Sequence, residues 1–411
     1  MWLYSFGIKV YYWVVVLAQL FSPKARAWVS GRKTQEVRLE AFNFDAPIWM
    51  HCSSLGEFEQ GRPIIEMMRQ RHPSQQIVLT FFSPSGYTTR KDFQHADLVC
   101  YMPLDTPDRA RKFIDRLKPR LAIMVKYDFW FNHLKILNDR GVPFIYVSLL
   151  LHPRHFLLRS HFRRLFNIFS QLNYAFTQDG ASQELLEAKG LSQVSTVGDT
   201  RIDRVLSINH EKKSFDFLDD LIAGHRVFIF GSVWPADMVH LAPFINAAKK
   251  DKYLFIIASH EVDEKSLEKI DSYLEAGTDR FSALCSGQTM KTNIISVDTM
   301  GDLAQLYQYG YLAYVGGAFG HGLHSILEPA AAGLPIIFGP NYQKFREAVD
   351  LVALGAVFSV DSTKAFTTVA DRLQNDATYQ TAQNLIYEYL QANKGASSKI
   401  LRYLSEHNLI G

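Results

Sequence analysis

Residues 298–341 read DTMGDLAQLYQYGYLAYVGGAFGHGLHSILEPAAAGLPIIFGPN. Asp298-Thr299 can cap the start of a helix, because a side-chain oxygen accepts one of the unpaired N–H groups there. The apolar run Tyr311–Val315 predicts a strand, and Gly316-Gly317 follows where the chain must turn tightly. A second helix is expected to open near His324-Ser325, before another strand. Helix, strand, glycine turn, helix and strand are the alternation of an α/β domain.

The same stretch predicts half of a nucleotide-sugar site. A helix start beneath a glycine-rich turn presents unpaired N–H groups and a positive dipole end, which suits a phosphate. Glu328 lies on the first turns of the second expected helix and needs a different partner, for which a pair of sugar hydroxyls is suited. The residues of this predicted half-site are Thr299, Met300, Gly301, Gly316, Gly317, His324, Ser325, Glu328 and Asn341.

The bulk properties indicate an ordinary globular protein of two domains. A chain of 411 residues exceeds the roughly 250–300 residues that one hydrophobic core usually reaches. Hydrophobic residues make up 47% and charged residues 21%, and a net charge of +3 is too small to indicate a nucleic-acid partner. The cysteines, Cys52, Cys100 and Cys285, are few and far apart, which favours a reducing compartment over a disulfide framework.

The N-terminus departs from this average. Residues Trp2–Phe21 are dense in aromatic and aliphatic side chains, and basic residues follow them. The uncharged part, Val10–Ala18, is short for a spanning helix, which needs about 20 residues. A signal peptide cleaved at Ala25-Arg26-Ala27, a single spanning helix and a core helix of a soluble domain are alternatives. We favour a membrane-associating segment at residues 1–33, lying on the cytoplasmic leaflet with its basic residues near anionic lipid.

Apolar runs alternate with helical segments in the rest of the chain, which predicts parallel sheets covered on both faces. A polar span at about Asp203–Ala223 predicts a linker. We therefore expect two doubly wound domains, at residues 34–205 and 206–411, facing each other across a cleft with ligands at the carboxyl ends of the strands. The predicted strands are Ile48–Cys52, Ile77–Phe82, Leu98–Met102, Leu121–Val125, Phe144–Leu151, Tyr174–Thr177, Val227–Phe230, Tyr253–Ala258, Asn293–Val297, Tyr311–Val315, Pro335–Phe338 and Ala356–Val360.

In the first half, HCSSLGEFEQGRPII at residues 51–65 carries a candidate base. A loop with Ser54 and Gly56 follows a strand, and Glu57 stands where a helix begins. A carboxylate at a helix start is often only a capping or dipole partner. Because α/β active sites are built at the carboxyl ends of strands, Glu57 can also serve as general base toward a hydroxyl. Glu59, the nearest other carboxylate, faces elsewhere.

Two more loops of the first half carry polar groups after predicted strands. Residues 81–91, FFSPSGYTTRK, are rich in hydroxyls and include Arg90, which can bind an anion or belong to a plain capped turn. Lys126 and Asp128 directly follow another strand, which predicts that their loop lines the cleft. The basic residues between positions 154 and 164 suit a solvated face or a lipid phosphate.

In the second half, GSVWPAD at residues 231–237 follows a strand, where backbone N–H groups and the Ser232 hydroxyl can bind phosphate. His260 follows the next strand, although a structural histidine is the more frequent outcome. Asn341 can cap a turn or touch a ligand. No His, Asp or Glu cluster has metal-ligand spacing, and the glycines at 316–320 lack the context of a dinucleotide motif.

Taken together, these motifs resemble the 3-deoxy-D-manno-oct-2-ulosonic acid (Kdo) transferases of lipopolysaccharide synthesis, which have the GT-B fold of two Rossmann-like domains. The resemblance covers the apolar N-terminus, Ser54–Glu57, PLDTP at Pro103–Pro107 and GDTRID at Gly198–Asp203. It is most specific in DTMGDL, VGGAF and LEPAAAGLPIIFGPN, all within residues 298–341.

This resemblance implies an inverting glycosyltransferase that moves Kdo from CMP-Kdo to the lipid A precursor, lipid IVA, at the cytoplasmic face of the inner membrane. It implies Glu57 as the base, an acceptor-binding domain at residues 34–205, a donor-binding domain at 206–411, and no metal ion or other cofactor. The implied acceptor-side residues are Ser54, Gly56, Arg90, Lys126 and Asp128. The implied donor-side residues are Ser232, His260, Thr299, Met300, Gly301, Gly316, Gly317, His324, Ser325, Glu328 and Asn341.

Several family motifs are altered, which indicates a divergent branch. An acidic-Thr-acidic run becomes Lys126-Tyr127-Asp128, an Arg-His-Pro loop becomes Ser259-His260-Glu261, and a Gly-Gly-His-Asn turn becomes Gly322–Ser325. Two rival functions remain. One is another GT-B transferase or a sugar-nucleotide epimerase that uses a UDP-sugar, and the other is a catalytically idle membrane-bound relative.

Overall fold

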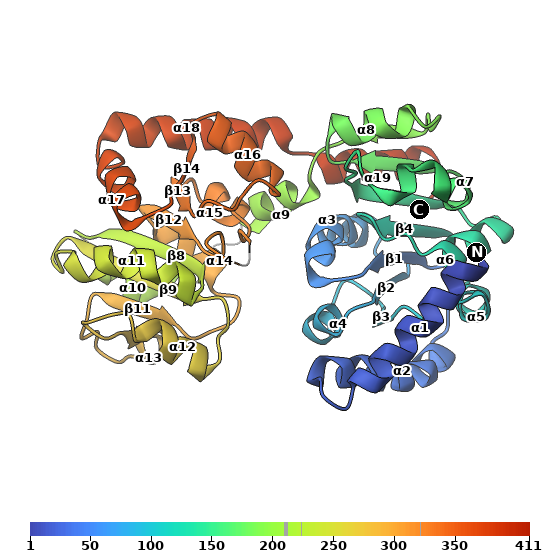
Figure 1. The fold of residues 1–411 in the computed structure, drawn as a ribbon, viewed down its shortest axis with the longest axis horizontal. Helices are drawn as coiled ribbons and strands as arrows, with labels where there is room; N and C mark the ends of the chain where they lie inside the picture. The colour runs from blue at the N-terminus through green and yellow to red at the C-terminus, as the bar shows by residue number, and fades with distance from the viewer. Residues whose placement is uncertain (209–212, 223, 321) are drawn as a thin grey trace. The chain divides into compact units, whose positions relative to one another are not determined.

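The computed structural model describes residues 1–208, 213–222, 224–320 and 322–411, and it divides into two compact units (Figure 1). The first unit comprises Met1–Arg204 and Lys394–Gly411, and the second comprises Val205–Asn393. The chain passes from the first unit into the second between Arg204 and Val205. The return of residues 394–411 to the first unit differs from the predicted domain at 206–411. Residues 209–212 and 223 of the predicted linker lie outside the described residues.

The first unit is built on a sheet of seven parallel strands in the order β3-β2-β1-β4-β5-β6-β7. The order reverses between β1 and β4, so the sheet is doubly wound, as predicted. The strands are β1 (Ile48–Cys52), β2 (Ile77–Phe81), β3 (Leu98–Tyr101), β4 (Leu121–Val125), β5 (Phe144–Leu149), β6 (Tyr174–Thr177) and β7 (Val194–Thr196).

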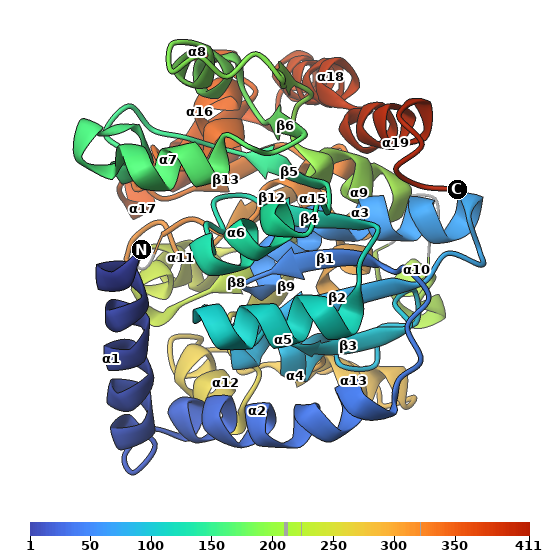
Figure 2. The ribbon, with the colours of Figure 1, turned by 90° about the vertical axis from the view of Figure 1, so that its right-hand side faces the viewer.

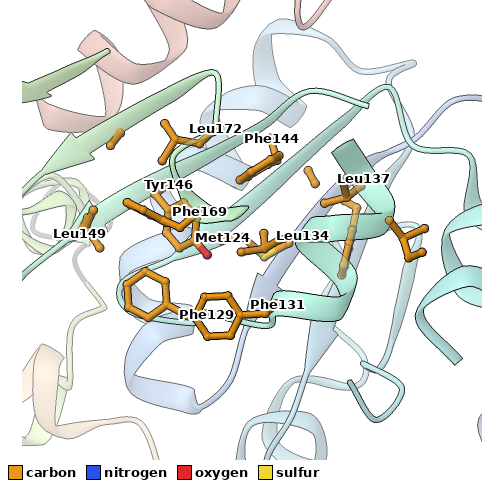
Figure 3. Packing of buried hydrophobic residues seen from close by; sticks show 14 of the residues in the cluster. Met124, Phe129, Phe131, Leu134, Leu137, Phe144, Tyr146, Leu149, Phe169 and Leu172 are labelled. Atoms are coloured by element: carbon orange, nitrogen blue, oxygen red, sulfur yellow. The ribbon is translucent and has the colours of Figure 1, made fainter. Parts of the chain in front are cut away.

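Helices cover both faces of this sheet, because successive strand residues point to opposite sides and almost all are apolar. On one face Phe129, Tyr146 and Phe169 pack ring against ring within the core of the unit (Figure 3). The helices of the unit are α1 (Trp2–Ala18), α2 (Pro23–Ala41), α3 (Leu55–Arg71), α4 (Pro84–Arg90), α5 (Pro107–Leu117), α6 (Phe131–Asp139), α7 (Arg163–Phe169), α8 (Gly180–Glu187), α19 (Ala396–Glu406) and α9 (Thr200–Ile208), which continues into the second unit.

Helix α19 explains why residues 394–411 belong to the first unit. Its side chains Ile400, Leu401 and Leu404 are fully buried in the same cluster as Met50 of β1 and Ile64 of α3. The half-buried Asp203 carboxylate also accepts the N–H groups of Gly395 and Ser397 at the start of this segment. An apolar helix face of this kind is stable only against the sheet that it covers.

The second unit repeats the doubly wound plan with seven parallel strands in the order β10-β11-β9-β8-β12-β13-β14. Here the order reverses between β8 and β12. The strands are β8 (Arg226–Val233), β9 (Tyr253–Ser259), β10 (Asp279–Arg280), β11 (Ile294–Val297), β12 (Leu312–Val315), β13 (Ile336–Phe338) and β14 (Val357–Ser359). The helices are α10 (Asp216–Leu221), α11 (Pro235–Ala247), α12 (Glu264–Asp271), α13 (Phe281–Cys285), α14 (Leu303–Leu306), α15 (Leu327–Ala331), α16 (Arg346–Ala353), α17 (Thr363–Arg372) and α18 (Asp376–Asn393).

Two helices begin later than the sequence predicts. The Asp298 carboxylate does not cap α14 but accepts the N–H and hydroxyl of Ser282 in α13, and α14 begins only at Leu303. Helix α15 begins at Leu327, although it keeps Glu328 in its first turn. Helices of four and five residues have few aligned peptide dipoles, so their predicted contribution to phosphate binding is small.

The N-terminal helix α1 lies beside the first unit (Figure 2), and many of its apolar side chains, among them Trp2, Leu3 and Phe6, are exposed. No residue of α1 is buried, and Trp13 and Leu17 are 63% and 65% exposed. The Tyr4 hydroxyl anchors the helix by donating to Asp105 Oδ2 at 2.6 Å. Among the described residues, no single helix is long and apolar enough to cross a membrane. The pair Trp2–Ala18 and Pro23–Arg32 meets that test together but is bent by 119°.

Candidate active site

Several of the predicted site residues in each unit follow the two strands at which the strand order reverses. In a doubly wound sheet, ligands bind in the crevice beyond the carboxyl ends of those two strands. In the first unit β1 and β4 lead into Ser53–Glu57 and Lys126–Asp128. In the second unit β8 and β12 lead into Trp234–Asp237 and Gly316-Gly317. Each unit therefore offers one candidate half-site.

Glu57 closes a capping box at the start of α3. The Ser54 N–H and hydroxyl donate to Glu57 Oε2 at 2.7 and 3.1 Å, and the Glu57 N–H donates to Ser54 Oγ at 3.4 Å. The capping interpretation is thus confirmed, and it engages Oε2. The Glu57 side chain sits at the switch point with only 8% of the residue exposed. The same bonds that cap the helix fix the direction of the carboxylate.

Asp128 holds the neighbouring residue of the same loop. The Ser53 N–H donates to Asp128 Oδ2 at 2.9 Å, and the Ser53 hydroxyl donates to Oδ1 at 2.7 Å. Ser53 therefore donates its N–H and hydroxyl to Asp128, and Ser54 donates its N–H and hydroxyl to Glu57. Asp128, predicted to contact the acceptor, therefore also positions the loop that carries Glu57.

Burial is the main electrostatic influence on this pair of carboxylates. It raises the pKa of Glu57 above its ordinary value, and it raises that of Asp128 well above, with a further contribution from the charge of Glu57. Lys126 opposes the shift at both groups. Its backbone φ of +63° is uncommon for a residue other than glycine and costs about 1 kcal/mol or more. The strained backbone holds a cation beside a candidate base.

His51 does not supply a second cation, although its Nε2 lies 3.5 Å from Asp128 Oδ2. The ring is fully buried, and burial holds the pKa of His51 well below its ordinary value. Nδ1 lies 2.8 Å from the Thr80 hydroxyl. His51 is therefore neutral at physiological pH, and Lys126 is the cation that acts on the carboxylate pair.

The contacts of Arg90 and its loop favour a capped turn over an anion site. Ser83 caps α4 by accepting the Gly86 N–H. The Arg90 guanidinium donates to Glu59 Oε1 at 3.0 Å and lies 5.4 Å from the ring centre of Phe58. This ion pair also explains why Glu59 does not compete with Glu57. Gly56 is exposed in the first turn of α3, where an added Cβ would meet only Ser54 Oγ, at 3.9 Å.

In the second unit the structure brings His260 and His324 together around Trp234. The ring centres of Trp234 and His260 are 4.3 Å apart and those of His260 and His324 are 4.4 Å apart. Trp234 Nε1 donates to His324 Nε2 at 3.1 Å. A pocket of about 550 Å³ opens beside this stack, a volume in the range of small-molecule sites. Its polar lining includes Ser259, His260, Glu261, Lys265, Ser266 and Lys269.

The glycine turn lies against the end of β8. A Cβ on Gly316 would come within 2.4 Å of the Ser232 carbonyl oxygen, and Gly317 has a φ of +93°. The Gly316 N–H donates to the Gly231 carbonyl at 2.9 Å, and the Gly317 N–H donates to Asp237 Oδ2 at 2.9 Å. Both N–H groups are thus already bonded. Gly316 lets the turn approach the end of β8 closely, and Gly317 lets the backbone turn with a positive φ. The half-exposed Ser232 lies beside them.

The other predicted donor-side residues lie outside the Trp234 stack. Thr299, Met300 and Gly301 follow β11, which β9 separates from β8. The Thr299 hydroxyl donates to Asp302, and Met300 is 80% exposed. Ser325 accepts the Leu327 N–H at the start of α15, and the exposed Asn341 donates its N–H to the Ala318 carbonyl. Among the described residues, no group of His, Cys, Asp or Glu is arranged to hold a metal ion.

Sequence reasoning missed Trp234 and Asp237, although both lie in the GSVWPAD segment that it singled out. Asp237 is fully buried and bonds both loops at the switch point. A usable signal was present, since an acidic residue three positions after the N-cap of a helix is its N3 capping partner. The long-range bond to the glycine turn had no signature in the sequence.

The chain is similar in sequence to one group of known proteins and in fold to another. Residues 23–204 match the family model described as 3-deoxy-D-manno-octulosonic-acid transferase (Kdo transferase). The curated 3-deoxy-D-manno-octulosonic acid transferase of Haemophilus influenzae is 26% identical over 383 residues, which cover 88% of this chain and 87% of that protein. That of Chlamydophila psittaci is 24% identical over 383 residues, 86% of each chain. The structure of UDP-GlcNAc 2-epimerase from Neisseria meningitidis shares the fold, with a TM-score of 0.62 and 14% identity over 88% of this chain and 100% of that chain.

Proposed function

We propose that this chain, which matches the Kdo transferase family model over residues 23–204, is a glycosyltransferase of lipopolysaccharide synthesis that transfers Kdo from CMP-Kdo to the lipid A precursor lipid IVA. The observation that carries this proposal is the buried Glu57 at the switch point of a domain that matches this family. The second unit, with Ser232 beside the glycine turn, supplies the donor side.

In the proposed reaction, an acceptor sugar hydroxyl attacks the anomeric carbon of Kdo. Its proton passes to the Glu57 carboxylate, the bond from the anomeric carbon to the CMP phosphate oxygen breaks, and CMP leaves with the electron pair. A single displacement of this kind inverts the anomeric configuration. A base with a raised pKa holds the abstracted proton more firmly, which supports the role of Glu57.

The direct test incubates the purified protein with lipid IVA and CMP-Kdo generated in situ. Mass spectrometry of the lipid is expected to show the addition of Kdo, and an unchanged lipid would favour the alternative of a catalytically idle relative.

Thermal unfolding in the presence of CMP and of UDP separates the donor classes, because a ligand stabilises only the state that binds it. Stabilisation by UDP and not by CMP would contradict the proposed donor.

Replacing Lys126 with methionine is expected to move the acidic limb of the pH–activity profile to higher pH. Transfer needs deprotonated Glu57, so activity is lost as the pH falls through its pKa. Burial already raises that pKa, and loss of the Lys126 charge removes an influence that lowers it. Lysine and methionine at position 126 carry the same backbone strain at a φ of +63°, so the substitution changes the charge without changing this cost. The measurement is kcat/KM against pH.

The Lys126→Arg variant is the matched control, since it keeps the charge and should keep the position of the acidic limb. A limb that stays in place in Lys126→Met, or moves to lower pH, would show that the group being titrated is not influenced by Lys126. Glu57 would then lose its assignment as the base.

We further propose that the protein works at the cytoplasmic face of the inner membrane with α1 against the lipid. The support is the exposed apolar side chains of α1 and the basic Lys24 and Arg26 that follow it. Replacing Trp13 and Leu17 together with glutamate is expected to release the protein from sedimenting anionic vesicles. Tyr387→Glu is the control, because Tyr387 in the second unit is as exposed as Trp13, at 63%. Equal sedimentation of both variants would contradict the proposal.

A further inference from the structure

Asp237 is a buried carboxylate that the reaction proposed above does not use. It stands at the N3 position of α11, with none of its surface exposed. Its three hydrogen bonds come from neutral donors: the Trp234 N–H at 2.8 Å, the Gly317 N–H at 2.9 Å and the Tyr314 hydroxyl at 2.8 Å. Taking a carboxylate out of water is costly, so a protein keeps such a group where its bonds hold something in place.

The two oxygens of Asp237 have separate partners. Oδ2 accepts the N–H groups of Trp234 and Gly317, which lie in the loops after β8 and β12. Oδ1 accepts the Tyr314 hydroxyl, which is its one hydrogen-bond partner among the residues that the structure describes, within the core of the unit. One oxygen thus joins the two loops that border the switch point, and the other fixes the carboxylate itself.

The joined loops carry the groups that surround the expected phosphate position. Gly316 packs against the Ser232 carbonyl, and the Gly316 carbonyl accepts the His324 N–H at 3.2 Å. The Trp234 ring reaches His324 through its Nε1. Moving Gly317 away from Trp234 would therefore shift Ser232, His324 and the ring stack relative to one another.

We propose that Asp237 is a positioning residue of the donor half-site, which holds the loops after β8 and β12 at the spacing that binds the donor nucleotide. This inference rests on the proposed function, because the ligand is the CMP moiety of the donor. The first unit has a parallel arrangement, since Asp128 from the loop after β4 holds Ser53 in the loop after β1. In each unit a buried carboxylate therefore joins the two loops across the reversal of strand order.

The test compares three variants that differ in which hydrogen bonds of the Asp237 carboxylate they keep. Asp237→Ala removes both loop bonds. Asp237→Asn can turn its amide oxygen to the two N–H groups and its NH₂ to the Tyr314 oxygen, so it keeps the loops joined. Tyr314→Phe removes the donor to Oδ1 and leaves both loop bonds intact. The readouts are CMP affinity by calorimetry, backbone hydrogen exchange in residues 231–237 and 314–320, and the midpoint of thermal unfolding.

In Asp237→Ala we expect CMP affinity to fall about tenfold or more, because small misplacements of binding groups have large effects, with faster exchange in both segments. Tyr314→Phe and Asp237→Asn should unfold at lower temperature but bind CMP within about twofold of the wild type. A purely structural role predicts instead that CMP affinity follows the unfolding midpoint across all three variants, and that result would overturn the inference. So would unchanged exchange or unchanged affinity in Asp237→Ala.

Asp237→Ser replaces Asp237→Ala if the alanine variant does not fold, since its hydroxyl fills part of the space without reaching both loops. A wild-type protein that does not bind CMP would refute the proposed donor and the nucleotide-positioning role together. A wild-type protein that binds CMP, with an Asp237→Ala variant that binds it equally well, would refute the positioning role alone.

Discussion

Glu57→Gln is expected to reduce the rate of Kdo transfer by about 10²–10⁴-fold, the usual contribution of a general base. The glutamine amide cannot take the proton of the attacking hydroxyl. Its oxygen can still accept the Ser54 N–H, because a capping box works with either Glu or Gln at this position. The fold and CMP affinity should therefore stay close to those of the wild type. The measurement is the initial rate of transfer at saturating donor and acceptor.

Two further variants separate catalysis from helix capping. Glu57→Ala loses both functions, so it should be as inactive as Glu57→Gln and also less stable by about 0.3–1.5 kcal/mol. Glu59→Gln changes a carboxylate on the same helix that pairs with Arg90, and its activity should stay near normal. A Glu57→Gln enzyme that retains more than about a tenth of the normal rate would rule out Glu57 as the base.

Leu404→Ala is expected to destabilise the first unit by about 2–5 kcal/mol, although residue 404 follows the whole of the second unit. The Leu404 side chain is fully buried in the core that contains β1 and α3. Its removal leaves a cavity in that core. Urea unfolding, followed by hydrogen exchange in peptides from each unit, would show which unit loses stability.

The control for this experiment is Arg402→Ala on the exposed side of α19, which should change stability by no more than about 0.5 kcal/mol. CMP binding should survive in Leu404→Ala under conditions where the second unit remains folded. If instead the exchange of the second unit rose while β1 and β4 stayed protected, the assignment of α19 to the first core would be wrong.

The strands were predictable from sequence where both faces of the sheet are covered. β1 and β4 have the predicted bounds, because an apolar run buried on both faces is unambiguous once turns bound it. β7 and β10 escaped prediction. They are edge strands of three and two residues, and between them only Val194 is buried. So short a run carries no legible pattern.

The candidate sites were predictable only where their hydrogen bonds join residues that are close in the sequence. Glu57 and Ser54 form a capping box with a clear signature in the sequence. The bond from Ser53 to Asp128 spans 75 positions and that from Gly317 to Asp237 spans 80. The predicted cap at Asp298 was wrong for the same reason, because its partner Ser282 lies 16 positions earlier. Tertiary contacts override local preference at these places.

The return of α19 to the first sheet sets the order in which the protein can be completed. The ribosome makes residues 394–411 only after all of Val205–Asn393, so the second unit can fold while the first still lacks a covering helix. Until α19 arrives, the strand face with Met50 remains open on the nascent chain. The unit that carries Glu57 is therefore begun before the second unit and completed only after it.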